Sequence, residues 1–334
     1  MAITKIPAAG FTGNNFRNII INGDMSIAQR STSVASITAS SYNTLDRFRI
    51  NISSAGTWTQ SQSTDVPSGQ GFAKSLKMDC TTADASLGAS DILGIQTRFE
   101  GQNLQYLKKG TANAESVTMS FWVRSNKTGT YICELSDNDN TRHIAKSYTI
   151  SIADTWEKKT ITYAGDTTGA LGNDNGDSFR VNFHLAAGTD YTSGTLATSW
   201  SSYTAANRAV GQVNLADDTA NEWYITGVQL EAGTTASDFE FLPFDVNENR
   251  CLRYFYFDDC ELFMYTNRVS DTPRAGQKQF PIPMRAAPTF TSITSTEISN
   301  TAMTDSSRFM ATFRQSGSDG NVPRYNSYSF SSEL

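Results

Sequence analysis

Short stretches of alternating apolar and polar residues recur along the chain between turn-forming clusters. The clearest spans residues 117–137, where every second residue is apolar on both sides of a turn at 126–129. The apolar positions are Val117, Met119, Phe121 and Val123 before the turn, and Tyr131, Cys133 and Leu135 after it. Because side chains alternate between the two faces of a strand, this pattern predicts a β-hairpin with one buried face.

The same alternation predicts further strands at 45–52, 73–80, 146–152, 158–165, 177–188 and 222–233. Residues 18–25 predict a buried first strand that ends in a tight turn at 22–24. A short helix is predicted only over 102–110, where two lysines and a glycine suit a last turn. Many short strands without alternating long helices predict an all-β fold, an antiparallel β-sandwich or jelly roll.

Three parts are expected along the chain. Residues 1–18 combine Pro, Gly and Asn with little apolar periodicity, which predicts an extended N-terminal arm that needs a partner. Residues 19–245 form the predicted jelly-roll domain. Near residue 245 the composition becomes richer in Ser, Thr, Arg and Pro, which predicts a smaller C-terminal β domain over 246–334. Within it, the three prolines of 280–290 suit an edge strand or an extended segment.

Composition narrows the class of protein. The 334 residues include 27 Lys and Arg against 33 Asp and Glu, and no basic run exceeds two residues, which argues against nucleic-acid binding. Only 18% of residues are charged, whereas Ser and Thr number 38 and 40, as expected of a β-rich, weakly charged surface protein. We find neither an apolar run long enough for membrane insertion nor a secretory signal, so we expect assembly in a cytoplasm.

Catalytic and metal-binding motifs are not found in the sequence. The four cysteines form no C-x-x-C pair, so we expect reduced thiols, no zinc site and no cofactor. His143 and His184 lie near no recognisable nucleophile and are interpreted as plain sheet or loop histidines. Acidic loops near 137–139 and 174–177 suit hairpin loops better than calcium loops. A carboxylate pair for glycoside cleavage stays open, because separation in space is invisible here.

Aromatic residues are the remaining signal for binding. Trp122 lies on the face of its strand opposite to the apolar one, and Trp200 and Tyr203 lie in a loop region rich in Gly, Ser and Thr. Exposed rings flanked by polar side chains suit sugar recognition, because a ring stacks on a pyranose while amides and hydroxyls pair with its OH groups. Core packing is the competing interpretation for each of the three.

Several stretches in order resemble a known family: NIIINGDMSIAQRSTS, YNTLDRF, SFWVRSNKTGTY, TWEKKTITYAGDTTG and YITGVQLEAGTTASDFEFLPF. They resemble the carbohydrate-binding-module-like jelly roll of tail fibres and other virion structural proteins of tailed bacteriophages. ENRCLRYF with FPIPMRAAPTF resembles the C-terminal domain that often follows it there. The resemblance spans roughly residues 18–290.

The resemblance implies a non-enzymatic virion component, a homotrimer that binds other virion proteins through residues 1–18 and presents its β domains to host-surface glycans. Related sugar-binding modules often hold a structural calcium near their first strand, and only Asp24 carries over as a ligand here. Tyr254 and Tyr325, with neighbouring arginines, could form either a receptor-contacting tip or the seam of the trimer.

Three classes of function therefore compete. A receptor-binding tail fibre predicts glycan binding, whereas a purely structural capsid fibre, decoration protein or tail adaptor predicts the same folds without sugar affinity. A glycan depolymerase predicts a carboxylate pair in a groove. The first two are favoured, because the matching motifs are strand-and-turn motifs rather than catalytic ones.

Overall fold

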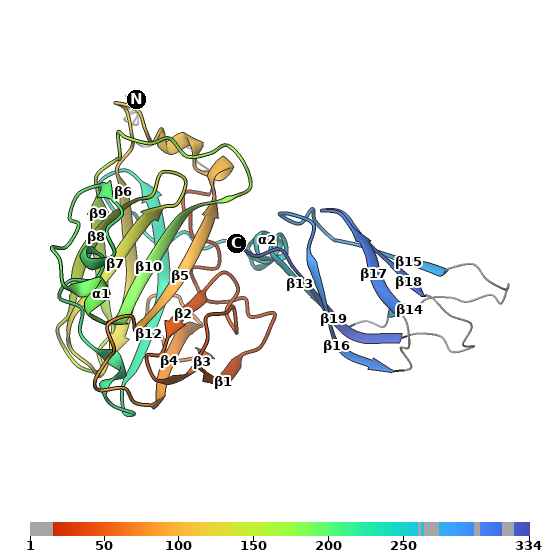
Figure 1. The fold of residues 1–334 in the computed structure, drawn as a ribbon, viewed down its shortest axis with the longest axis horizontal. Coiled ribbons are helices and arrows are strands. Elements are labelled where there is room, and N and C mark those ends of the chain that lie inside the picture. Colours follow the sequence, from red (N-terminus) through yellow and green to blue (C-terminus); the bar gives the residue numbers. More distant parts are fainter. Residues whose placement is uncertain (1–15, 260–261, 264–273, 297–300, 316–323) are drawn as a thin grey trace, which may run out of the picture.

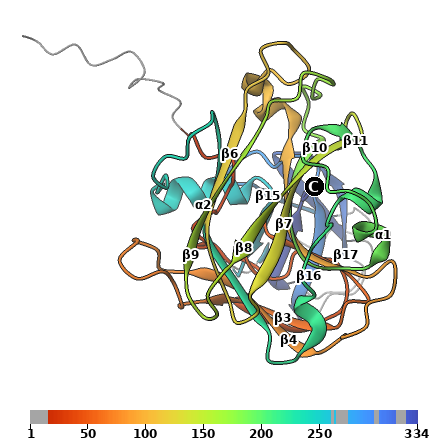
Figure 2. The ribbon, with the colours of Figure 1, turned by 90° about the vertical axis from the view of Figure 1, so that its left-hand side faces the viewer.

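The structure is a computed structural model that describes residues 16–259, 262–263, 274–296, 301–315 and 324–334; at 262–263, 274–276, 292–296, 301–305, 312–315 and 324–327 it describes the backbone alone. Two β-rich units lie side by side, and helix α2 (Phe244–Leu252) lies at their junction (Figure 1). In the view turned by 90°, the second unit lies behind the first (Figure 2). The described residues include no helix long and apolar enough to cross a membrane.

The first unit is a sandwich of two six-stranded antiparallel sheets. Sheet A has the order β1 (Ser33–Ile37), β3 (Thr57–Ser63), β4 (Ser75–Thr82), β12 (Glu222–Ala232), β6 (Val117–Ser125) and β9 (Glu157–Tyr163). Sheet B has the order β11 (Ser201–Ser202), β8 (Arg142–Ile150), β7 (Gly129–Asp137), β10 (Asp177–Ala187), β5 (Ile92–Glu100) and β2 (Arg49–Ser53). The predicted all-β, antiparallel sandwich or jelly-roll fold is confirmed.

One apolar core fills the space between these sheets. Phe121 from sheet A contacts Tyr148 and Phe183 from sheet B edge-to-face, with ring centroids 5.0 and 5.1 Å apart. Edge-to-face pairs add to the stabilisation that area burial gives. Cys80, Cys133 and Cys251 are free thiols, and all three are buried; Cys260 lies outside the described residues. Burial raises the pKa of Cys133 to about 12, which keeps that thiol protonated.

The buried faces predicted for residues 117–137 are confirmed, but the predicted hairpin is wrong. All seven apolar positions are 5% exposed or less. However, β6 pairs with β9 and β12 in sheet A, whereas β7 pairs with β8 and β10 in sheet B. The turn at 126–129 therefore carries the chain from one sheet to the other. Alternation specifies which face is buried, and two strands that face one core from opposite sheets show the same alternation as a hairpin.

The strand predicted at 18–25 is also wrong. Ile19, Ile20 and Ile21 are buried, but they form no regular ladder. The Ile19 N–H donates to the Leu230 carbonyl at 2.9 Å, and the side-chain oxygen of Asn18 accepts from the Leu230 N–H at 3.1 Å. A side-chain amide thus takes the place of a backbone partner, which an apolar run cannot reveal.

The tight turn predicted at 22–24 is confirmed. The Met25 N–H donates to the Asn22 carbonyl at 3.0 Å, and both residues have a positive φ near 60°. Gly23 lies against β12, where an added Cβ would be 2.1 Å from the Val228 carbonyl oxygen. Glycine is therefore required at this position by the close approach of the two backbones.

The helix predicted over 102–110 is replaced by two 3-10 turns, η2 (Gly101–Asn103) and η3 (Gln105–Leu107). Lys108 has a φ of 52°, so the chain reverses there and no α-helix continues. Helix α2, which the alternation did not reveal, follows Pro243 and has Asp245 in its first turn and Arg250 in its last. The other helical segments are α1 (Thr189–Thr192), η4 (Ala205–Asn207) and η5 (Leu215–Asp217).

The second unit contains two smaller sheets. In one, β19 (Arg324–Ser331) pairs with β13 (Phe255–Asp258), β14 (Leu262–Phe263) and β16 (Thr289–Thr296). In the other, β18 (Met310–Gln315) pairs with β15 (Arg274–Gln279) and β17 (Thr301–Ser306). The proline-rich residues 280–288 form no strand and connect β15 to β16, with Phe280 and Met284 buried.

Buried charges join the two units. The Arg253 guanidinium binds the Glu100 carboxylate at the end of β5, with an Nη2–Oε2 distance of 2.6 Å. The Tyr254 hydroxyl donates to the same carboxylate at 2.6 Å. On the other side, Arg47 binds Glu333 and lies over the Tyr254 ring at 3.5 Å. Since these groups are largely withheld from water, their pairing fixes how the second unit sits on the first.

We expect the substitution Phe121→Ala to lower the free energy of unfolding by about 3–5 kcal/mol, because it leaves a cavity between the two sheets. Chemical denaturation of the purified protein measures this change. Thr160→Ala, at an exposed position of the neighbouring strand β9, serves as the control and should change it by less than about 0.5 kcal/mol. A near-neutral Phe121→Ala variant would contradict the described core.

Candidate functional site

The outer face of sheet B is polar along four neighbouring strands. β2, β7, β10 and β5 each place apolar residues into the core and polar residues on the opposite face. The polar positions are Arg49 and Asn51 in β2, Gln96 and Arg98 in β5, Glu134 and Ser136 in β7, and Arg180, Asn182 and His184 in β10. Because side chains alternate along a strand, these residues share one surface.

The strand register arranges these side chains in two rows across the sheet. The first row, from β2 to β7, is Arg49, Gln96, Asn182 and Glu134. The second row, from β5 to β8, is Arg98, Arg180, Ser136 and His143. Residues directly opposite each other on paired strands lie close enough for their side chains to interact. The rows therefore place amides, hydroxyls and guanidinium groups next to one another.

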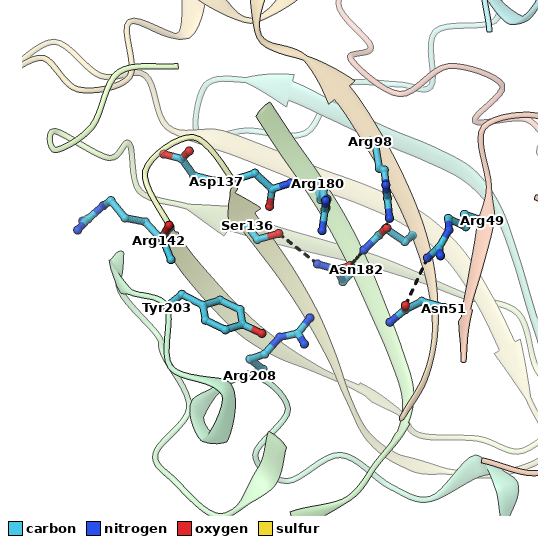
Figure 3. Close-up of a pocket in the computed structure, with 13 residues that line it drawn as sticks. Arg49, Asn51, Arg98, Ser136, Asp137, Arg142, Arg180, Asn182, Tyr203 and Arg208 are labelled. Carbon is cyan, nitrogen blue, oxygen red and sulfur yellow. Dashed lines mark hydrogen bonds between the residues drawn. The ribbon is translucent and has the colours of Figure 1, made fainter. Parts of the chain in front are cut away.

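A groove of about 380 Å³ lies over these rows (Figure 3). Tyr203 and Arg208, from the segment that follows β11, form one wall, and Thr141 and Arg142 also line the groove. The Tyr203 ring is 40% exposed. Figure 3 shows the Tyr203 and Arg208 side chains on one side of the groove and Arg49 and Arg98 on the other.

The Glu134 carboxylate lies beneath the groove and is completely buried. Arg208 binds both of its oxygens, with Nε 3.1 Å from each and Nη2 2.9 Å from Oε2. His143 Nδ1 and His184 Nε2 lie 3.0 and 3.1 Å from it, and Asn182 donates to it at 3.3 Å. The carboxylate thus connects β7, β8, β10 and the wall segment of the groove.

Burial alone raises the pKa of Glu134, but the charge of Arg208 and the hydrogen bonds from both histidines outweigh it and hold the pKa well below its ordinary value of 4.5. Burial also lowers the pKa of His184, against the opposing pull of Glu134. At neutral pH the carboxylate is therefore ionised and His184 is neutral, donating through Nε2. The Arg208 guanidinium consequently keeps one orientation on the groove wall.

A chain of hydrogen bonds also fixes the floor of the groove. Gln96 Nε2 donates to Asn182 Oδ1 at 2.6 Å, and Arg98 Nε donates to Gln96 Oε1 at 2.6 Å. Arg98 and Arg180 share the Asp177 carboxylate, with Arg98 Nη1 at 3.2 Å and Arg180 Nε at 2.9 Å from Oδ2. The floor is a preformed surface, since its side chains are already held by one another.

No protein-family model and no curated protein matches this sequence. Among solved structures, the chain is similar to the enzymatically active domain of tailspike protein 4 of bacteriophage CBA120, at 12% identity and a TM-score of 0.33. That match covers 65% of this chain and 22% of the tailspike chain, so this chain spans about a fifth of that neighbour.

The chain is also similar to the xylan-binding domain of CBM22, at 14% identity and a TM-score of 0.31, covering 61% of this chain and 96% of that one. A third neighbour is the family 11 carbohydrate-binding module of Clostridium thermocellum in complex with a β-1,3-1,4-mixed-linked tetrasaccharide, at 12% identity and a TM-score of 0.29. It covers 61% of this chain and 99% of that one. All three TM-scores lie below 0.5, so the assignment of function depends on the groove itself.

Of the sequence-predicted aromatic residues whose side chains the structure describes, Tyr203 alone lines this groove. Trp200 is half-buried against the core, where its Nε1 donates to the Ala164 carbonyl at 2.8 Å and Lys109 lies 4.9 Å from its ring. It caps the sandwich, as its core-packing interpretation predicts. Trp122 lies on the outer face of sheet A, half-buried beside Phe239 and Phe241 in a separate pocket of about 320 Å³.

The predicted receptor-contacting role of Tyr254 is wrong. Its side chain is 1% exposed, and its hydroxyl binds Glu100 between the two units. The sequence of the aromatic segment around Tyr254 does not show whether a face without a partner in its own unit is covered by the neighbouring unit. Tyr325 lies in β19, paired with Leu262 and Ser295, but its side chain lies outside the described residues, as does most of the predicted arm, residues 1–15.

Asp24, the predicted calcium ligand, accepts hydrogen bonds from Ser26 Oγ at 3.1 Å and from Asn247 Nδ2 at 3.0 Å. In the described ranges, no three His, Cys, Asp or Glu side chains are grouped so that they could hold a metal ion. Calcium binding at Asp24 stays a prediction.

The sequence did not point to Glu134, to Arg208 or to the arginines of the two rows, Arg49, Arg98 and Arg180. Both histidines were interpreted as plain sheet or loop residues, yet both bind one buried carboxylate. A signal was present, because the charged and amide residues of four strands all occupy the positions that alternate with apolar ones. Arg208 had no such signal, since it comes from an irregular segment that only the fold brings to the sheet.

We expect Glu134→Gln to lower the free energy of unfolding by about 3–5 kcal/mol, because it leaves the Arg208 charge without its buried partner. Urea denaturation measures the change, with Glu115→Gln, a surface residue paired with Lys108, as the control. Because the folded-state pKa of Glu134 is depressed, its contribution is present above pH 4.5 and is lost as the pH falls below that value. A variant as stable as the wild type at pH 7 would contradict this network.

Proposed function

We propose that the protein is a non-enzymatic, tail-fibre-type virion protein that binds a host-surface glycan in the groove of sheet B. One observation carries the proposal: a preformed row of amide, hydroxyl and guanidinium groups lies beside an exposed tyrosine ring. Amides and hydroxyls can pair with sugar OH groups, and a ring can stack on the apolar face of a pyranose. Because the side chains are already held in place, little conformational entropy remains to be lost on binding.

The acidic groups of the groove support a binding role over glycan cleavage. Glycoside hydrolysis needs a carboxylic acid with a raised pKa beside a second carboxylate. Glu134 has a lowered pKa and is bound by Arg208 and two histidines. Asp137, the acidic residue that lines the groove, is held by Lys109. Both carboxylates are therefore already bound to cationic side chains.

The virion assignment is supported by the resemblance of the ordered strand-and-turn segments to tail-fibre and other virion proteins. In this proposal, residues 1–18 bind other virion proteins, three copies associate, and the two β units are presented outward. A structural capsid fibre, decoration protein or tail adaptor is the alternative, and it differs in having no affinity for glycans.

We expect the purified, intact protein to bind saturably to at least one member of an array of bacterial capsular and O-antigen polysaccharides. Tyr203→Ala should weaken that binding about tenfold or more, since it removes the ring from the groove. Tyr106→Ala is the matched control, because Tyr106 is 39% exposed and lies outside the groove. Titration of each variant against the best array member measures the effect.

The outcomes separate the classes of function. A folded protein that binds no glycan on the array would overturn the proposal and favour the structural alternative. Binding that survives Tyr203→Ala but is lost on Trp122→Ala would move the site to the pocket on sheet A. Release of shorter saccharides from a bound polysaccharide would favour a depolymerase.

We expect sedimentation equilibrium to give the mass of three copies of the 36.5 kDa chain. The expectation comes from the resemblance to fibre proteins, which are commonly homotrimers. Repeating the measurement over a range of protein concentrations distinguishes a stable trimer from weak association. A mass of one copy at every concentration would remove the trimer from the proposal.

A further inference from the structure

Some of the charges around the groove are balanced in ion pairs. Glu134 balances Arg208. At the end of the groove, Lys109 and Arg142 are balanced by two carboxylates, Asp137 and Asp166. Groups paired in this way exert little net electrostatic attraction on a ligand in the groove.

Three guanidinium groups on the floor are not balanced. Arg98 and Arg180 share one carboxylate, that of Asp177. Arg49 donates to the amide oxygen of Asn51 at 3.3 Å, and within the described part of the chain no carboxylate lies within ion-pair distance of it. Three positive charges therefore face one negative charge, although the whole chain carries a net charge of −6.

The positions of these arginines carry an energetic cost in the unliganded protein. Arg98 lies directly opposite Arg180 in the β5–β10 ladder, and like charges in that position are destabilising. Burial lowers the pKa of Arg98 and of Arg49, and the charge of Arg180 lowers both further. A bound anion would relieve the repulsion that these three groups exert on one another.

We propose that the groove binds an acidic glycan, and that Arg49, together with Arg98 and Arg180, binds an oxyanion carried by the sugar. This inference rests on the proposed function. The oxyanion is a carboxylate, phosphate or sulfate, because a guanidinium fork pairs with each of these through charge-assisted hydrogen bonds. Asn51, Gln96 and Asn182 lie beside the arginines and supply the amides that pair with the sugar OH groups.

The neighbouring groups favour an acidic sugar over an acidic peptide. An extended peptide typically adds to an exposed strand edge through its backbone, whereas this surface is the face of the sheet and presents side chains alone. The combination of guanidinium groups, amides and the Tyr203 ring matches a sugar that has OH groups, a charged substituent and an apolar face.

The test uses the intact protein and the array of capsular and O-antigen polysaccharides, whose repeating units are either neutral or acidic. We expect the acidic members to bind at least about tenfold more tightly than the neutral ones, and to lose affinity as the salt concentration rises. The best-bound polysaccharide is then compared with its carboxyl-reduced, dephosphorylated and desulfated forms. The treatment that abolishes binding identifies which oxyanion is bound.

Variants assign the anion to the arginines. Arg49→Gln should weaken binding of the acidic polysaccharide about tenfold and reduce its salt dependence, whereas Arg49→Lys, which keeps the charge but not the guanidinium fork, should lose less affinity and keep the salt dependence. Arg124→Gln is the matched control, because Arg124 is an ion-paired arginine on the outer face of sheet A.

Each outcome decides the inference. Neutral and acidic glycans bound equally well, with Arg49→Gln unchanged, would overturn the acidic-glycan inference and leave the proposed glycan binding intact. No binding to any array member would overturn both. Preference for acidic members that is lost on Arg124→Gln but kept on Arg49→Gln would show that the anion binds on the other sheet.

Discussion

The buried Glu134 carboxylate is the interaction on which the groove depends. It receives hydrogen bonds from strands β8 and β10 and a bidentate guanidinium from the wall segment. A carboxylate without these partners could not remain ionised in a completely buried position, because its desolvation would be uncompensated. This carboxylate, together with the pairing of β11 with β8 and the hydrogen bond from the Tyr203 N–H to the Thr141 carbonyl, therefore holds sheet B and the segment that carries Tyr203 and Arg208 in one arrangement.

Stability alone does not explain such a network. Well-packed apolar side chains of similar volume often stabilise a fold as well as a buried ion pair does, or better. Polar groups, however, fix orientation, since a guanidinium bound to both oxygens of a carboxylate has little freedom to rotate. The same reasoning applies to the opposed Arg98 and Arg180, whose placement costs stability and supplies a concentrated positive charge.

The alternation of apolar and polar residues was sufficient to predict which face of each strand is buried. It assigned Val117, Met119, Phe121 and Val123 to the core and identified most strands of the sandwich. It missed β5, because Thr97 interrupts the apolar positions Leu93, Ile95 and Phe99, and a glycine lies among the polar positions that alternate with them. It also placed β6 and β7 in one hairpin, since burial specifies a face but not a hydrogen-bonding partner.

The groove could not be predicted in the same way, because the strand order determines which polar side chains become neighbours. Arg49 and Gln96 are far apart in the sequence, and the β2–β5 register alone puts them opposite each other. Tyr203 was identified by its loop setting, whereas Tyr254 could not be distinguished from an exposed tyrosine without the contact between the two units.

Strand β5 links the groove to the second unit. Gln96 and Arg98 lie on the groove floor, and Glu100, at the end of the same strand, binds Arg253 and Tyr254. Strand β5 is paired with β10 on one side and with β2 on the other, which makes it stiff. The few residues from Gln96 to Glu100 therefore fix the position of the groove relative to the second unit. Under the proposed function, a glycan in the groove would thus be held in a defined orientation relative to the second unit.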